Sequence, residues 1–140
     1  MRSKADRGSA ATEVAVMAPL VVLLLVIVAM AGRGVTARMD VDSVAGAAAR
    51  AASLARSPAA AQQAAYLTAE ANLGGGRITC ATLDVDVNTT EFAPGGRVSV
   101  TVSCVVQLSD LAAGAAIPGS LTLTSTATSG IDQWRGVTGP

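Results

Sequence analysis

A continuous run of hydrophobic residues dominates the N-terminal part of the sequence, from Val14 to Ala31. Its 18 residues carry no charge, and as a helix they would extend roughly 27 Å, enough to span the hydrocarbon core of a bilayer. Pro19 lies inside the run and predicts a kink or a local opening, because proline cannot donate a backbone hydrogen bond. The pattern predicts a membrane-spanning helix.

The helical pattern continues beyond this run as far as Arg56. Small apolar residues recur there at three- and four-residue intervals, which is typical of one narrow face of a helix; they are Val41, Val44, Ala45, Ala48, Ala52 and Ala55. Such small side chains allow a helix to pack closely against a neighbour. A helix unbroken from Ala10 to Arg56 would hold 47 residues and measure roughly 70 Å.

A second helix is predicted after Ser57. A serine side chain can accept a hydrogen bond from a free N–H group of the first helical turn, and Pro58 suits the first helical position. The residues that follow are rich in alanine and other strong helix formers, and Gly74-Gly75-Gly76 ends them. We therefore expect a second helix and a glycine-rich linker over residues 57–76.

Alternation of polar and apolar residues replaces the helical period from residue 77 onward. Strands are predicted at Thr79–Asn88, Arg97–Leu108 and Leu121–Thr128, the last of them polar at every second position. Pro94-Gly95-Gly96 indicates a turn between the first two strands, and Ser109–Gly119 is expected to be a loop or a short helix. The expected fold class is α+β: a long N-terminal transmembrane helix followed by a small antiparallel β-sheet domain at residues 77–140.

The two cysteines, Cys80 and Cys104, fall on the first two predicted strands, each 12 residues from the middle of their connection. They could face each other across a hairpin and form a disulfide. In that register, however, Val98 would lie opposite Asp86, whereas a slip of one residue would align the apolar faces. A β-bulge could reconcile the two requirements. The alternative to a disulfide is a pair of buried free thiols.

Composition and charge narrow the function classes. Hydrophobic residues make up 51% of the chain but aromatic residues only 2%, so the core is small and would gain from a disulfide, a membrane or neighbouring subunits. Formal net charge is zero and no basic patch with aromatic residues occurs, so we expect no binding of nucleic acid. The sequence has no histidine and lacks a catalytic set. We predict no enzyme activity, no cofactor and no metal.

Three acidic residues lie close together in the sequence, Asp84, Asp86 and Glu91. They could suggest a metal or hydrolase site. We expect them instead on a solvated sheet face and in the hairpin turn.

The residues that flank the hydrophobic run predict its orientation. Arg2, Lys4 and Arg7 precede it, and Arg33 and Arg38 follow it. The more basic N-terminal flank is expected in the cytoplasm, which puts the C-terminal domain outside. A C-terminal domain outside the reducing cytoplasm also favours the disulfide between its two cysteines.

Glu13 stands at the start of the hydrophobic run, five residues after Gly8. A carboxylate at the edge of a membrane segment is costly and suggests a function. The alternative is an ordinary interfacial acid that stabilises the N-terminus of a helix.

The hydrophobic run Val14–Ala31 has two other interpretations. It could be a plain single-pass anchor. It could also be a signal peptide, since Ala29-Met30-Ala31 before Gly32 fits a cleavage site with small residues. The chain would then be a secreted β-rich binding or cell-surface protein.

The N-terminal half resembles the TadE-like family of minor pilins and pilus-assembly proteins, which belong to the tight-adherence branch of type IV pili. The residues that carry the resemblance are Arg7-Gly8-Ser9-Ala10-Ala11-Thr12-Glu13, then Ala18-Pro19-Leu20 with the valine/leucine run, and the alanine-rich Ala45–Ala55. Together they cover roughly residues 7–56.

The resemblance implies cleavage after Gly8 by a prepilin peptidase. Residues 1–8 would be a basic leader peptide, and Ser9 would begin a transmembrane and extended pilin-like helix at residues 9–56. Glu13 would then be the fifth residue and would neutralise the new amino terminus of a neighbouring subunit. Implied partners are other pilin subunits, the inner-membrane assembly platform, the peptidase and the lipid bilayer. A minor subunit is favoured because a folded domain follows the helix.

Overall fold

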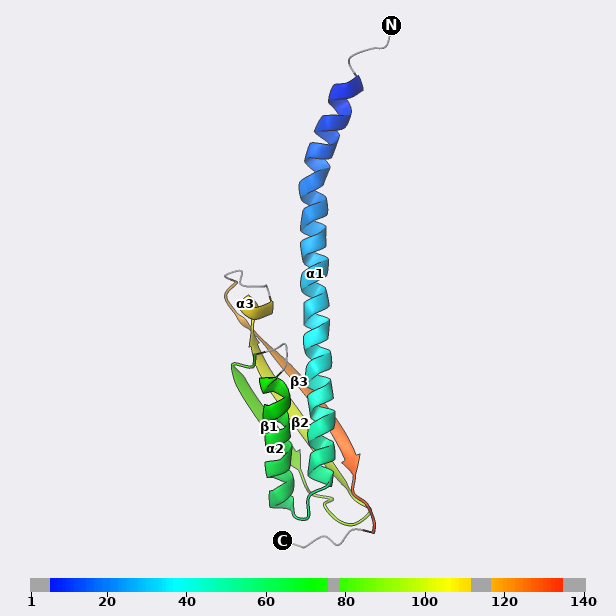
Figure 1. Cartoon of the computed structure of the whole chain (residues 1–140), viewed down its shortest axis with the longest axis vertical. Helices are drawn as coiled ribbons and strands as arrows, with labels where there is room; N and C mark the ends of the chain where they lie inside the picture. Colours follow the sequence, from blue (N-terminus) through cyan, green and yellow to red (C-terminus); the bar gives the residue numbers. More distant parts are fainter. Residues whose placement is uncertain (1–5, 76–78, 112–116, 135–140) are drawn as a thin grey trace. The chain divides into compact units, whose positions relative to one another are not determined.

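The computed structural model describes residues 6–75, 79–111 and 117–134 (Figure 1). Residues 1–5 of the expected leader peptide, Gly76 at the end of the expected linker and Arg77 at the start of the expected β-rich domain lie outside the described residues. The chain divides into two compact units, Met1–Gly34 and Val35–Pro140.

Helix α1 spans Asp6–Ser53 and contains 48 residues. It begins four residues earlier than Ala10 and ends three residues before Arg56. The helix runs unbroken through Pro19. The long helix predicted from the hydrophobic pattern is therefore confirmed, and it crosses from the first compact unit into the second.

Helix α2 spans Pro58–Gly74 and begins as the sequence predicts. The backbone N–H of Ala60 donates a hydrogen bond to the Ser57 hydroxyl at 3.3 Å, and Pro58 occupies the first turn. At the other end the N–H of Gly75 bonds the carbonyl oxygen of Leu73. Each end of α2 thus has a local hydrogen bond of the kind that caps a helix.

The second compact unit contains one antiparallel sheet with strands β1 (Thr82–Asn88), β2 (Arg97–Gln107) and β3 (Ser120–Gly130), in the order β1-β2-β3. The short helix α3 (Leu108–Leu111) follows β2. The predicted fold class, α+β with a long apolar N-terminal helix and a small antiparallel sheet, is confirmed.

The register between β1 and β2 differs from the expected one. Cys104 lies opposite Leu83, not opposite Cys80, so the pairing is displaced by three residues. The ladder is continuous from Thr82 to Asn88, so no bulge interrupts this pairing. An odd displacement brings the apolar faces of the two strands together, so that Val85 lies opposite Val102. This register follows the burial of apolar side chains. Cys80 can still reach Cys104, because it precedes β1 and the alternation of side chains along the strand does not restrict it.

The core of this unit lies between one face of the sheet and two helices, the C-terminal part of α1 and α2 (Figure 1). On the helices most core residues are alanines: Ala37, Ala45, Ala48, Ala49 and Ala52 of α1, and Ala61, Ala65 and Ala69 of α2. Every second residue of β2 faces them, and Val98, Val100 and Val102 are fully buried. Small helical side chains let the helices approach the sheet closely, so the valines fill the space between.

The connection between β1 and β2 contains Gly96, which has no room for a side chain. The N–H of Gly96 donates to the carbonyl oxygen of Ala93 at 2.8 Å, and the N–H of Arg97 donates to that of Glu91 at 3.2 Å. A Cβ atom on Gly96 would overlap the Glu91 carbonyl oxygen. That oxygen belongs to the backbone and cannot rotate away.

We expect Gly96→Ala to destabilise the protein by about 1–3 kcal/mol, because the turn must move to admit the methyl group. Thermal unfolding of the full chain in detergent measures the effect. Gly46→Ala in α1 is the matched control, since no atom lies within 4 Å of its added Cβ, and it should keep or raise the stability. A Gly96→Ala variant as stable as the parent would contradict the overlap.

Candidate functional site in the N-terminal segment

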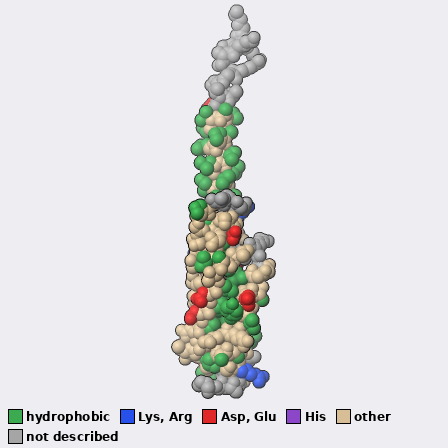
Figure 2. Space-filling model, turned by 90° about the vertical axis from the view of Figure 1, so that its left-hand side faces the viewer, with side chains coloured by type: hydrophobic (Ala, Val, Ile, Leu, Met, Phe, Trp, Pro, Cys, Tyr) green, Lys and Arg blue, Asp and Glu red, His purple; other side chains and the backbone are tan. Residues whose placement is uncertain are grey.

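The apolar part of α1 presents its side chains to the surroundings on every side. Each large hydrophobic residue from Val14 to Val28 is between 49% and 75% exposed. The helix from Glu13 is long and apolar enough to cross a membrane, with a mean hydropathy of 3.0 in its most apolar window. Figure 2 shows hydrophobic side chains covering this part of the helix. An exposed apolar surface of this kind requires lipid or other protein to cover it.

The residues of the expected processing site lie in the same helix. Gly8 and Ser9 belong to the helical backbone of α1. Side chains of the N-terminal segment are described from Glu13 onward, so the contacts of Gly8 and Ser9 lie outside the described part. The Glu13 side chain is exposed and opens the apolar segment. The five-residue step from Gly8 to Glu13 corresponds to roughly 7.5 Å along a helix axis.

Cys80 and Cys104 form a disulfide in the second compact unit. Their Cα atoms are 5.4 Å apart, which suits the bond. Cys104 is fully buried in β2, while Cys80 lies in the segment before β1. In that segment the N–H of Ala81 also donates to the carbonyl oxygen of Val105 at 2.7 Å. The disulfide therefore fastens the approach to β1 onto the middle strand.

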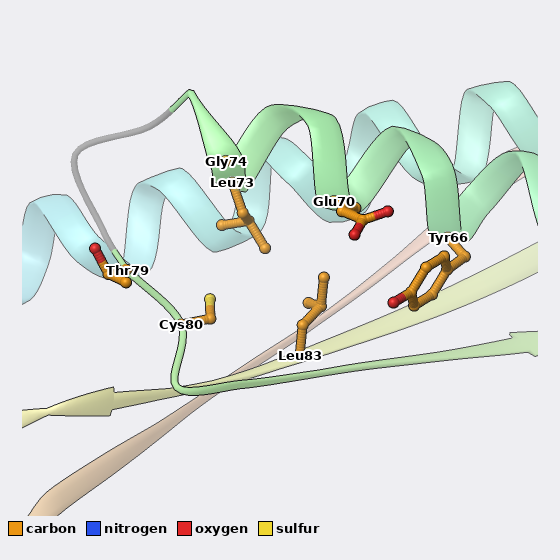
Figure 3. Close-up of a pocket in the computed structure, with 7 residues that line it drawn as sticks. All are labelled: Tyr66, Glu70, Leu73, Gly74, Thr79, Cys80 and Leu83. Carbon is orange, nitrogen blue, oxygen red and sulfur yellow. The ribbon is translucent and has the colours of Figure 1, made fainter.

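A shallow pocket of about 300 Å³ lies between the end of α2 and the start of β1. Its lining residues are Tyr66, Glu70, Leu73, Gly74, Thr79, Cys80 and Leu83 (Figure 3). Leu73 and Leu83 point toward each other from the helix and the strand. The lining offers one carboxylate and no histidine, so it does not supply a nucleophile with a matching general base. Among the described residues no group of three His, Cys, Asp or Glu side chains could hold a metal ion.

The three acidic residues noted in the sequence occupy separate places. Asp84 and Asp86 are exposed on β1. Glu91 lies in the connection to β2 and forms an ion pair with the Arg97 Nε at 2.7 Å. Both partners of that pair are well exposed, so it contributes little to stability.

A row of hydroxyl groups crosses the sheet face that points away from the helices. The hydroxyls of Thr101 and Thr126 share a hydrogen bond of 2.9 Å, and those of Ser103 and Thr124 share one of 3.1 Å. A third links Thr128 to Ser99 at 3.2 Å. Alternation in the third strand indicated a polar face, but the cross-strand pairs depend on the register.

Comparison with known proteins identifies a matching family model. Residues 8–50 match the family model for TadE-like protein. These residues form a TadE-like segment. The match begins at Gly8, includes Glu13 and the whole apolar run, and ends at Arg50 in the part of α1 that packs against the sheet. The resemblance inferred from the sequence is thereby confirmed. No curated protein and no solved structure matches the chain.

Residues 8–50 are thus similar to TadE-like proteins over the first part of the chain. The long apolar helix α1 suits a membrane-anchored protein. The match leaves α2 and the whole sheet outside it.

Proposed function

We propose that the protein is a pilin-like minor subunit or membrane component of a tight-adherence type IV pilus assembly system. The observation that carries the proposal is the coincidence of the TadE-like segment with the exposed apolar part of α1 that follows Glu13. A filament subunit needs such a helix twice, first to stay in the lipid and then to pack against the same helix of other subunits.

The proposed topology has the N-terminus in the cytoplasm and the domain from residue 77 to 140 outside. The basic residues before the helix favour this orientation. The disulfide between Cys80 and Cys104 also supports it, because such bonds persist outside the reducing cytoplasm. The partners would be other pilin subunits, the inner-membrane assembly platform and a prepilin peptidase, with the bilayer around the helix.

Processing after Gly8 would remove residues 1–8 and leave Ser9 as the first residue. Residues 9–56 would then form the assembly helix, and residues 57–76 would link it to the sheet. Glu13 would lie close enough to the membrane core to need a counter-charge, and the ammonium group of a neighbouring Ser9 can supply it.

N-terminal sequencing of the protein made in its own host tests the proposal. We expect Ser9 as the first residue, because cleavage after Gly8 creates the terminus that Glu13 can pair with. A chain beginning at Met1 or Arg2 would instead indicate an unprocessed membrane component.

A secreted protein remains the second candidate, cleaved after Ala31. The observation that favours it is that the second compact unit begins at Val35, so this cleavage would leave the unit whole. A chain that begins at Gly32 and leaves the membrane fraction would establish this alternative and exclude the pilin-like one.

A further inference from the structure

The two edges of the sheet differ in a way that the fold itself does not require. Among the described strands, β1 and β3 are both outer strands and each pairs only with β2. Strand β1 has 7 residues and carries Asp84 and Asp86. Strand β3 has 11 residues and contains neither a charged residue nor a proline. Proteins usually protect a free edge with charge, proline or shortness, and β3 has none of these.

On the sheet face that points away from the helices, residues of β1 lie in line with residues of β3 across β2. Asp84 lies opposite Ser103, which lies opposite Thr124. Asp86 is linked in the same way through Thr101 to Thr126. One edge therefore presents carboxylates at the same heights at which the other edge presents hydroxyl groups.

The direction of the strands also matches. Strands β1 and β3 are both antiparallel to β2 and so run parallel to each other. Strand β3 of one copy can therefore lie beside β1 of a second copy while both copies keep the same orientation. Copies inserted in one membrane share one orientation, so neither domain has to be turned over.

We propose that β3 of one copy pairs in parallel with β1 of a second copy and extends the sheet from subunit to subunit. The proposal goes beyond the proposed function, because the TadE-like segment ends at Arg50 and includes no strand. A head-to-tail contact uses a different surface on each copy and can repeat along a row of copies.

Chemical complementarity supports this pairing on both faces of the sheet. On the outward face a threonine hydroxyl of β3 can donate to a carboxylate of β1 in the next copy, a hydrogen bond strengthened by the charge. On the helix-facing side, Leu123 and Ala127 of β3 would continue the apolar row onto Leu83 and Val87.

Other pairings of the same edges are less complementary. Pairing β1 with β1 would bring four carboxylates of two copies together, and like charges on neighbouring strands repel. Pairing β3 with β3 would leave both acidic edges open. In the antiparallel form it would also turn one domain over relative to the other.

Cysteine cross-linking in membranes tests the contact with the full chain. Two copies with different tags are co-expressed, one with Thr126→Cys and the other with Asp86→Cys, and mildly oxidised. Neighbouring strands lie roughly 4.8 Å apart, which is within reach of a disulfide. The two native cysteines are paired with each other. We expect a covalent dimer that carries both tags, and no dimer from either variant alone.

A second pair, Thr124→Cys with Asp84→Cys, guards against a local defect and should give the same mixed dimer. Adding Thr126→Asp to the copy that carries Thr124→Cys places a carboxylate beside Asp86 of the other copy. This substitution should lower the cross-linked fraction roughly fivefold, equivalent to about 1 kcal/mol. Thr126→Asn is the matched uncharged control and should keep the fraction. Absence of mixed dimers from both pairs, with the native disulfide intact, overturns the proposal. Dimers from Thr126→Cys alone also overturn it, because they show pairing of β3 with β3.

Cross-linking is measured in the membrane fraction and needs no pilus. A mixed dimer with an unprocessed N-terminus would therefore support the sheet contact while contradicting proposed processing. An N-terminus at Ser9 without mixed dimers would support the proposed processing and contradict the sheet contact.

Discussion

Replacing Glu13 with alanine is expected to leave the protein in the membrane but to exclude it from pili. Insertion should persist or improve, because the substitution removes the one charge at the start of the apolar segment. Assembly should fail because the amino terminus of a neighbouring subunit would lose its counter-charge in a medium of low dielectric constant. Removing one partner of a buried ion pair costs about 3–5 kcal/mol, which predicts at least a hundredfold loss of incorporation.

Two fractions measure this prediction: the amount of protein in membranes and the amount in sheared pili. Glu13→Gln keeps the size of the side chain without its charge and should fail like alanine. Asp42→Ala, an exposed acid of α1 beyond the apolar run, is the matched control and should assemble normally. Normal incorporation of Glu13→Ala would remove Glu13 from any role in assembly.

Removal of the disulfide should have the second large effect. Replacing both Cys80 and Cys104 with serine opens a loop that spans 24 residues, and the loss of this constraint is expected to cost about 3.5 kcal/mol. The cost weighs heavily in this domain because alanines form much of its core, so that little apolar area per residue is available to compensate.

Urea unfolding of the full chain in detergent, followed by the circular dichroism of the sheet, measures the loss. Reduction of the parent protein should lower the midpoint as much as the double substitution does. Ser99→Ala, which removes one hydroxyl from the exposed sheet face, controls for a change of a polar side chain on β2. An unchanged midpoint in the double variant would show that the disulfide adds no stability.

The elements of the fold were predictable because their signals are local. The hydrophobic run and the alanines at helical spacing predict α1, and Ser57-Pro58 predicts the start of α2. Alternating valines predict β2, which the structure ends at Gln107, one residue before Leu108. Caps, proline and periodicity act over a few residues, so they can be interpreted without the rest of the chain.

The pairing of the strands was not predictable in the same way. Equal distances of Cys80 and Cys104 from the turn suggested that they lie opposite each other, but Leu83 takes that place. The register depends on which face α1 and α2 cover, and this is a property of the packed domain. The disulfide tolerates the displacement because Cys80 lies in the segment before the strand.

The N-terminal signal is local in the same sense, and for that reason the TadE-like character was recognisable from Gly8, Glu13 and the apolar run alone. Hydropathy, charge and spacing along one helix need no partner to be interpreted. The hydroxyl rows across β2 and β3, and the level acidic and hydroxyl edges of the sheet, arise only when residues far apart in the chain are paired. Tertiary packing decided them, because burying the valines against the alanine faces of two helices selects one register.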